Sequence, residues 1–164
     1  MSEQQLHSEV ARFLYLEARL LDEQRWDEWL NLYVEGATYW IPAWDSEHEL
    51  TDDPDSQLSL IYYSSRQGLE DRVYRVRTGR SSASTPLPRT CHLVTNVMVR
   101  ANGANQVSVD ACYQTLRYRL QQVDQFFGSY AYDLVRQDDQ WKITRKKIVV
   151  LNDCIPTVLD FYSV

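Results

Sequence analysis

The sequence lacks the features that would place it in a membrane or in a disulfide-bonded class. It has no apolar run of about 18 residues, the minimum for a transmembrane helix. Its N-terminal segment has no basic stretch followed by a small-residue cleavage site, so we expect no secretory signal. Its three cysteines, Cys91, Cys112 and Cys154, show no CxxC spacing. We therefore expect reduced thiols, packed as small hydrophobic side chains, in a cytoplasmic protein.

Positive charge is scarce as well. The chain has 17 Lys and Arg against 23 Asp and Glu, a formal net charge of −6. This balance disfavours nucleic acid as a partner, because neutralising phosphates requires a surplus of basic side chains. The 164 residues, 44% of them hydrophobic, suit one globular domain with a substantial core. We expect a single domain over residues 1–164 that binds neither nucleic acid nor membrane.

Motifs for catalysis and metal binding are absent too. No HExxH, GxSxG, P-loop or GxGxxG sequence occurs. The three histidines, His7, His48 and His92, lack the spacing of a non-haem iron site, and the paired Cys/His motifs of a Rieske cluster are missing. The acidic segment 43–57 lacks the central glycine and the final glutamate of an EF-hand. We expect no catalytic, cofactor-binding or metal-binding residue in this chain.

The first half of the sequence predicts helices. Apolar side chains in residues 6–21 recur at the spacing of one buried helical stripe. Asp22 can cap a second, shorter helix, which Gly36 would end. A short strand is predicted over residues 37–41, and a third helix over residues 58–78.

The second half predicts long strands joined by short turns. The strands are expected at residues 91–100, 107–120, 125–136 and 141–151. The second of them alternates, with one face formed by Val107, Val109, Ala111, Tyr113 and Thr115. Asn102-Gly103 and Asp138-Asp139 are typical of hairpin turns. Helices followed by a meandering antiparallel sheet define an α+β fold.

One segment of this acidic chain is basic. Residues 58–89 contain the arginines Arg66, Arg72, Arg75, Arg77, Arg80 and Arg89. Glu70 and Asp71 stand one helical turn from Arg66 and Arg75, the arrangement of an ordinary solvated face. The other arginines have no such local acid, and arginine is favoured for pairing with carboxylates at interfaces. From the residues alone, both a docking face and a solvated face remain open.

His92 also allows two interpretations. It can act as a general base in a pocket against the sheet, or it can be a core histidine that hydrogen-bonds the backbone or a polar neighbour such as Asn96.

Six stretches, in order and at fitting spacings, resemble a known family. They are Phe13–Tyr15 with Glu17–Asp22, Trp26–Leu30, Tyr39–Asp45, Ser59–Tyr63, Gly68–Val73 and Pro88–His92. Through them the chain, from about residue 10 onward, resembles the small (beta) subunit of the aromatic-ring-hydroxylating dioxygenases, in the branch that acts on benzoate, anthranilate and halobenzoates.

The resemblance implies a nuclear-transport-factor-2-like (cystatin-like) cone, with N-terminal helices packed on a curved antiparallel sheet. It implies an α3β3 hexamer with a large (alpha) subunit, in which copies of this chain also meet. The large subunit would carry a Rieske [2Fe-2S] cluster and a mononuclear non-haem Fe(II). Electrons would come from NADH through a reductase, and both atoms of O2 would enter the ring. Benzoate, anthranilate and 2-halobenzoate remain open as substrates, with Asp45–His48 leaning towards anthranilate by resemblance.

On this view the chain is a structural, non-catalytic subunit. Its expected interface residues are Trp40, Trp44, Arg66, Arg72, Arg75, Arg77, Arg80, Phe161 and Tyr162. Two alternatives stay open: a stand-alone cone-fold isomerase or dehydratase that uses His92 and Asp110, and a non-catalytic binding module without an enzyme partner.

Overall fold

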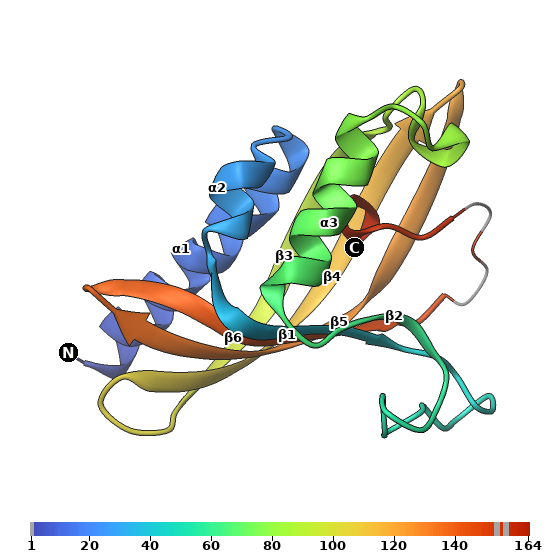
Figure 1. Cartoon of the computed structure of the whole chain (residues 1–164). Helices are drawn as coiled ribbons and strands as arrows, with labels where there is room; N and C mark the ends of the chain where they lie inside the picture. Colours follow the sequence, from blue (N-terminus) through green and yellow to red (C-terminus); the bar gives the residue numbers. More distant parts are fainter. Residues whose placement is uncertain (1, 153–154, 156–157) are drawn as a thin grey trace.

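The computed structural model describes residues 2–152, residue 155 and residues 158–164. It confirms the α+β fold, because the helices lie on one side of a curved sheet and the C-terminal segment returns to that side beside the third helix (Figure 1). The elements in chain order are α1 (Glu3–Asp22), α2 (Trp26–Leu30), β1 (Tyr33–Pro42), β2 (Ser59–Tyr63), α3 (Arg66–Arg77), η1 (Ser82–Ser84), β3 (Arg89–Ala101), β4 (Gln106–Arg119), β5 (Gln122–Gln137), β6 (Gln140–Val150) and η2 (Phe161–Ser163).

Helix α1 begins at a capping box and packs through the predicted apolar stripe. The Ser2 hydroxyl accepts a hydrogen bond from the Gln5 backbone N–H, and the Gln5 side-chain oxygen accepts one from the Ser2 backbone N–H, which satisfies two free N–H groups at the helix start. The apolar stripe is buried through Val10, Leu14 and Leu21. The helix therefore lies against the sheet along most of its length.

The sheet has the strand order β2-β1-β6-β5-β4-β3. Neighbouring strands run antiparallel, as predicted, except that β1 pairs with β6 in parallel. The predicted inner face of β4 is confirmed, since every second residue from Val107 to Thr115 is buried. This alternation sets which side chains of the sheet face the helices and which face away.

Two predicted helices were too long. The helix that starts at Trp26 ends at Leu30, and both Tyr33 and Gly36 belong to β1. Residues 59–63 form the edge strand β2 rather than the first turn of a helix, and α3 begins only at Arg66. In both places the local sequence favours a helix, but pairing with the neighbouring strand makes these residues part of the sheet.

The predicted turn at Asp138-Asp139 is confirmed by the left-handed backbone of both residues, with φ values of 49° and 60°. A further hairpin turn at Leu120-Gln121 has the same conformation, with φ values of 51° and 63°. Nothing in the side chains of Leu and Gln signals it, because these residues rarely adopt a positive φ.

The cysteine prediction is confirmed in one respect and wrong in another. Cys91 and Cys112 are free thiols, but both are exposed, because they lie on the outer face of β3 and β4, opposite the buried residues. Cys154 lies outside the described residues.

Candidate functional site

The centre of the cone contains a buried ion pair. Glu17 on α1 and Lys146 on β6 are 2% and 1% exposed, and their charged atoms lie 2.9 Å apart. The hydroxyls of Tyr33 and Tyr132 each donate to the Glu17 carboxylate at 2.7 Å, and the Trp29 indole donates at 3.2 Å. Glu17 therefore has four donors around it, whereas Lys146 has one carboxylate.

Burial and the ion pair shift the pKa values of these groups. Burial raises the pKa of Glu17, but the Lys146 ammonium and the hydrogen bonds from Tyr33 and Tyr132 outweigh it, so the pKa lies below its ordinary value. Burial lowers the pKa of Lys146 by more than the Glu17 carboxylate restores. Burial, together with the Glu17 charge, raises the pKa values of Tyr33 and Tyr132 far above the ordinary value, so both phenols stay neutral donors.

Aromatic rings fill the space around the ion pair. The Lys146 ammonium lies 4.4 Å from the centre of the Tyr130 ring and 5.3 Å from that of Tyr132, which adds cation–π attraction. On the helix side, Trp29 stacks on Phe161 with ring centres 5.1 Å apart and meets Tyr33 edge to face at the same separation. A centre occupied by the chain's own side chains argues against a stand-alone isomerase or dehydratase working there.

His92 lies near the sheet edge and binds Asp22. Its Nδ1 is 2.6 Å from one carboxylate oxygen of Asp22, and its backbone N–H donates to the other at 3.0 Å. The Thr90 hydroxyl donates to the same carboxylate at 2.8 Å. The predicted cap role of Asp22 is therefore wrong, because its carboxylate is used to attach α1 to the edge strand β3.

Asp110 does not lie beside His92, which argues against the alternative enzyme that would use both residues. It lies on β4 between the buried residues Val109 and Ala111, and strand alternation turns it to the opposite face. There it forms an exposed ion pair with Arg100 at 2.6 Å.

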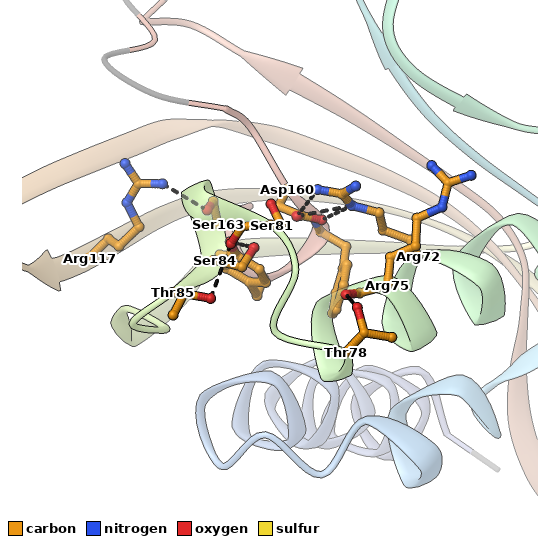
Figure 2. A network of polar contacts seen from close by, with 11 residues as sticks. Arg72, Arg75, Thr78, Ser81, Ser84, Thr85, Arg117, Asp160 and Ser163 are labelled. Atoms are coloured by element: carbon orange, nitrogen blue, oxygen red, sulfur yellow. Dashed lines mark hydrogen bonds and ion pairs between the residues drawn. The ribbon is translucent and has the colours of Figure 1, made fainter.

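Among the residues that the structure describes, three of the six arginines form ion pairs with acids. Arg66 pairs with Glu70, as its spacing predicts, at 2.8 Å. Arg72 donates to both oxygens of the buried Asp160 carboxylate, at distances of 2.5 to 3.0 Å (Figure 2). Arg77 pairs with an acid far away in sequence, Asp27 on α2, at 2.8 Å.

The Arg72 contact belongs to a polar network that holds the C-terminal segment. Figure 2 shows Asp160 of the returning chain bound to Arg72 of α3, with Arg117 reaching Ser163 from the other side. The Tyr162 hydroxyl lies 2.9 Å from that of Ser84. These contacts place Phe161 and Tyr162 in the core of this chain, and both rings are buried.

The other predicted interface residues differ in their exposure. Arg75 and Arg80 are exposed and form no ion pair within the described residues, and Tyr74 beside them is 72% exposed. Trp40 and Trp44 are half-buried. The Trp40 indole donates to Ser59 at 2.9 Å, and the Trp44 indole donates to the Val150 carbonyl at 2.8 Å.

Two further observations concern metal ions and membranes. Among the described residues, no group of three His, Cys, Asp or Glu side chains is arranged to hold a metal ion. No described helix is both long enough and apolar enough to cross a bilayer. The His, Cys, Asp and Glu side chains that the structure describes therefore do not fit an iron centre or a Rieske cluster.

Sequence analysis missed the ion pairs that organise the interior. Glu17 stands in the apolar stripe of α1, seven residues after Val10 and four before Leu21. Lys146 lies on the same buried face of β6 as Ile148 and Val150. A charge at a core position was the available signal, because such a charge needs a partner.

The chain is a cone in which helices pack on a curved sheet and its own side chains fill the centre. The comparisons with known proteins agree. Residues 16–157 match the model of the ring hydroxylating beta subunit family, and the chain belongs to that family. It is therefore a small subunit of a ring-hydroxylating dioxygenase, a non-catalytic component of an oxidoreductase whose large subunit is its partner.

Three relatives show how far the similarity extends. The chain is 45% identical to the 2-halobenzoate 1,2-dioxygenase small subunit of Burkholderia cepacia, covering 95% of this chain and 94% of the other. It is 42% identical to the benzoate 1,2-dioxygenase subunit beta of Acinetobacter baylyi, covering 95% and 92%. The crystal structure of the benzoate 1,2-dioxygenase beta subunit of Burkholderia mallei superposes with a TM-score of 0.81 at 39% identity, covering 96% of each chain. The predicted cone fold is thereby confirmed.

Proposed function

We propose that residues 1–164 act as one domain, which assembles with the large subunit into an α3β3 hexamer in the cytoplasm. The large subunit supplies the Rieske [2Fe-2S] cluster and the mononuclear non-haem iron, and a reductase delivers electrons from NADH. The substrate is an aromatic carboxylate, the class named in the 2-halobenzoate and benzoate dioxygenase relatives. The observation that carries the proposal is the 42–45% identity to dioxygenase small subunits along nearly the full chain.

The chain has a structural role in this assembly. Its filled centre, the buried Glu17–Lys146 pair and the Arg72–Asp160 contact support a rigid body, and its exposed cations and aromatic rings offer contact surfaces. A threefold ring requires each copy to touch its neighbours through two different patches. We assign the half-buried Trp40 and Trp44 to contacts between copies.

Co-expression with the large subunit tests this function. The two subunits are expected to co-elute from size-exclusion chromatography at the mass of a 3:3 complex. The small subunit alone is expected to bind no stoichiometric iron and to oxidise no aromatic acid. Separate elution of the two subunits at micromolar concentration would refute the proposal.

The exposed arginines give a second prediction. Arg75 and Arg80 have no acid within the described chain, so we assign them to pairing with carboxylates of the large subunit. The double variant Arg75→Glu/Arg80→Glu is expected to weaken assembly roughly tenfold, because like charges then face each other across the interface. Analytical ultracentrifugation of the mixed subunits measures the change.

Arg12→Glu is the matched control, because this arginine is exposed on α1, away from α3. Arg72→Glu is not an informative variant, since it breaks the contact with Asp160 inside the chain. Unchanged assembly of the double variant would remove Arg75 and Arg80 from the interface.

A further inference from the structure

The outer face of the sheet, on the side away from the helices, carries apolar side chains across β3, β4 and β5. Alternation turns these side chains outward, because Thr115, Arg117 and Phe126 between them are buried on the inner face. In the strand register they form three neighbouring rows, which are Arg89–Tyr118–Val123, Cys91–Leu116–Gln125 and Leu93–Gln114–Phe127.

The apolar members of these rows are open to solvent. Leu93 is 47% exposed, Val123 is 68% exposed and Phe127 is 40% exposed. A solvated face of an antiparallel sheet normally carries polar side chains, whereas the only charge in the three rows is Arg89. A contiguous exposed apolar surface with so little charge is typical of an interface. We call it the sheet patch, made of Leu93, Leu116, Tyr118, Val123 and Phe127.

A second exposed apolar surface lies at the opposite edge of the sheet. The strand order places β2 at one edge and β3 at the other. Leu58, just before β2, is 76% exposed, and Leu60 within β2 is 39% exposed. Trp40 on the neighbouring β1 faces outward, because Tyr39 and Ile41 on either side of it are fully buried. We call Trp40, Leu58 and Leu60 the edge patch.

Acidic side chains border the edge patch. Residues 43–57 join β1 to β2 and project beyond the sheet (Figure 1). The Thr51 hydroxyl donates to the Leu58 carbonyl at 2.9 Å, which ties this segment to the start of β2. Within the part of the chain that the structure describes, none of its exposed acids forms an ion pair; they are Asp45, Glu47, Glu49, Asp52, Asp53 and Asp55.

The two surfaces are complementary in charge. Arg89 forms no ion pair with a described residue, and its guanidinium lies 4.7 Å from the centre of the Tyr118 ring. Copies of a chain with a net charge of −6 repel each other unless their contact brings opposite charges together. Two sheet patches face to face would bring two arginines together. A sheet patch against an edge patch instead places Arg89 among the acids of residues 43–57.

We propose that neighbouring copies of this chain meet head to tail, with the sheet patch of one copy against the edge patch and residues 43–57 of the next. Because the two patches differ, each copy keeps one free patch until a ring closes. Closure at three copies rests on the proposed α3β3 assembly, whereas the contact itself does not. Helix α3, which carries Arg75, lies on the other side of the sheet and stays available to the large subunit.

Sedimentation velocity of the full-length small subunit alone tests the contact. The chain is expected to form trimers, with half of it assembled at roughly 10 µM. Arg89→Glu and Phe127→Glu are each expected to weaken this self-association by at least about tenfold, because each sets an acid against the acidic segment. Both side chains are exposed, so the fold is expected to be retained, and thermal unfolding of each variant checks this. Arg12→Glu, on α1, is the matched control and is expected to leave self-association unchanged.

A charge swap separates this contact from a general effect of charge. Glu47→Lys/Glu49→Lys alone is expected to weaken self-association by about tenfold, since two cations then face Arg89. Combining it with Arg89→Glu is expected to restore self-association to within about threefold of the unmodified chain, because the charges are opposite again.

Three results would overturn the proposal. They are a chain that stays monomeric up to about 500 µM, a combined variant that is no better than Arg89→Glu, and a Phe127→Glu variant that keeps its self-association but no longer co-elutes with the large subunit. The last result would assign the sheet patch to the large subunit instead. Failure of the unmodified chain to co-elute with the large subunit would refute the proposed function, and self-association of the small subunit alone would still decide the head-to-tail contact.

Discussion

Replacing Glu17 with leucine is expected to reduce the free energy of unfolding by about 3–5 kcal/mol, because the Lys146 ammonium then stays buried without its carboxylate. Leucine has a similar volume, so the loss reports the charge rather than a cavity. The hydroxyls of Tyr33 and Tyr132 also lose their acceptor. Urea unfolding of the full-length chain, followed by tryptophan fluorescence, measures the change.

The two halves of the ion pair are not equivalent. Lys146→Met leaves Glu17 with donors from Tyr33, Tyr132 and Trp29, whereas Glu17→Leu leaves Lys146 with ring faces only. Lys146→Met is therefore expected to cost less than Glu17→Leu. Glu28→Gln removes an exposed pair with Arg25 at 2.6 Å and is the control, with little change in stability. Equal losses for Glu17→Leu and Glu28→Gln would contradict the role assigned to the buried pair.

The pair also sets a pH dependence. The pKa of Glu17 in the folded chain lies below the 4.5 of an unperturbed glutamate. Its contribution to stability is therefore complete above pH 4.5 and is lost as the pH falls through the lower folded-state value. In Glu17→Leu this acid-sensitive component is absent. Because burial lowers the pKa of Lys146, the stability of that variant is instead expected to recover as the pH rises.

Sequence patterns predicted those parts of the fold in which one face is buried over many residues. The stripe of α1 and the alternation of β4 each repeat several times, and the repeats agree with one another. Short elements were predicted less well. The segments around Gly36 and at residues 59–63 are too short for their hydrophobic pattern to distinguish a helix from a strand. Pairing between strands decides which structure forms.

The candidate sites show the same limit. The Arg66–Glu70 pair was predictable because both residues lie on one helix. Arg72–Asp160 and Glu17–Lys146 join residues far apart in the sequence, and only the fold brings them together. The resemblance to dioxygenase small subunits supplied the function, since neither the arginines nor His92 specify it by themselves.

Phe161→Ala is expected to reduce the free energy of unfolding of the full-length chain by about 3–5 kcal/mol, the cost of removing a large ring from a packed core. Phe161 is fully buried, stacks on Trp29 at 5.1 Å, and meets Trp26 and Tyr162 edge to face at 5.7 and 5.4 Å. Tyr162→Phe is the control, because it removes one hydrogen bond to Ser84 and is expected to cost about 0.5–1.5 kcal/mol.

The same experiment separates the two roles that an apolar C-terminal segment can have. If Phe161 were a contact with another subunit, the isolated chain would keep its stability in Phe161→Ala, and only assembly would weaken. The structure predicts instead that Phe161→Ala already reduces the stability of the isolated chain. Arg72 binds Asp160 directly before this ring, so α3 and the C-terminal segment form one unit. Loss of the ring is therefore expected to loosen α3 as well, and to weaken any contact that Arg75 and Arg80 make, through the scaffold rather than at the interface itself.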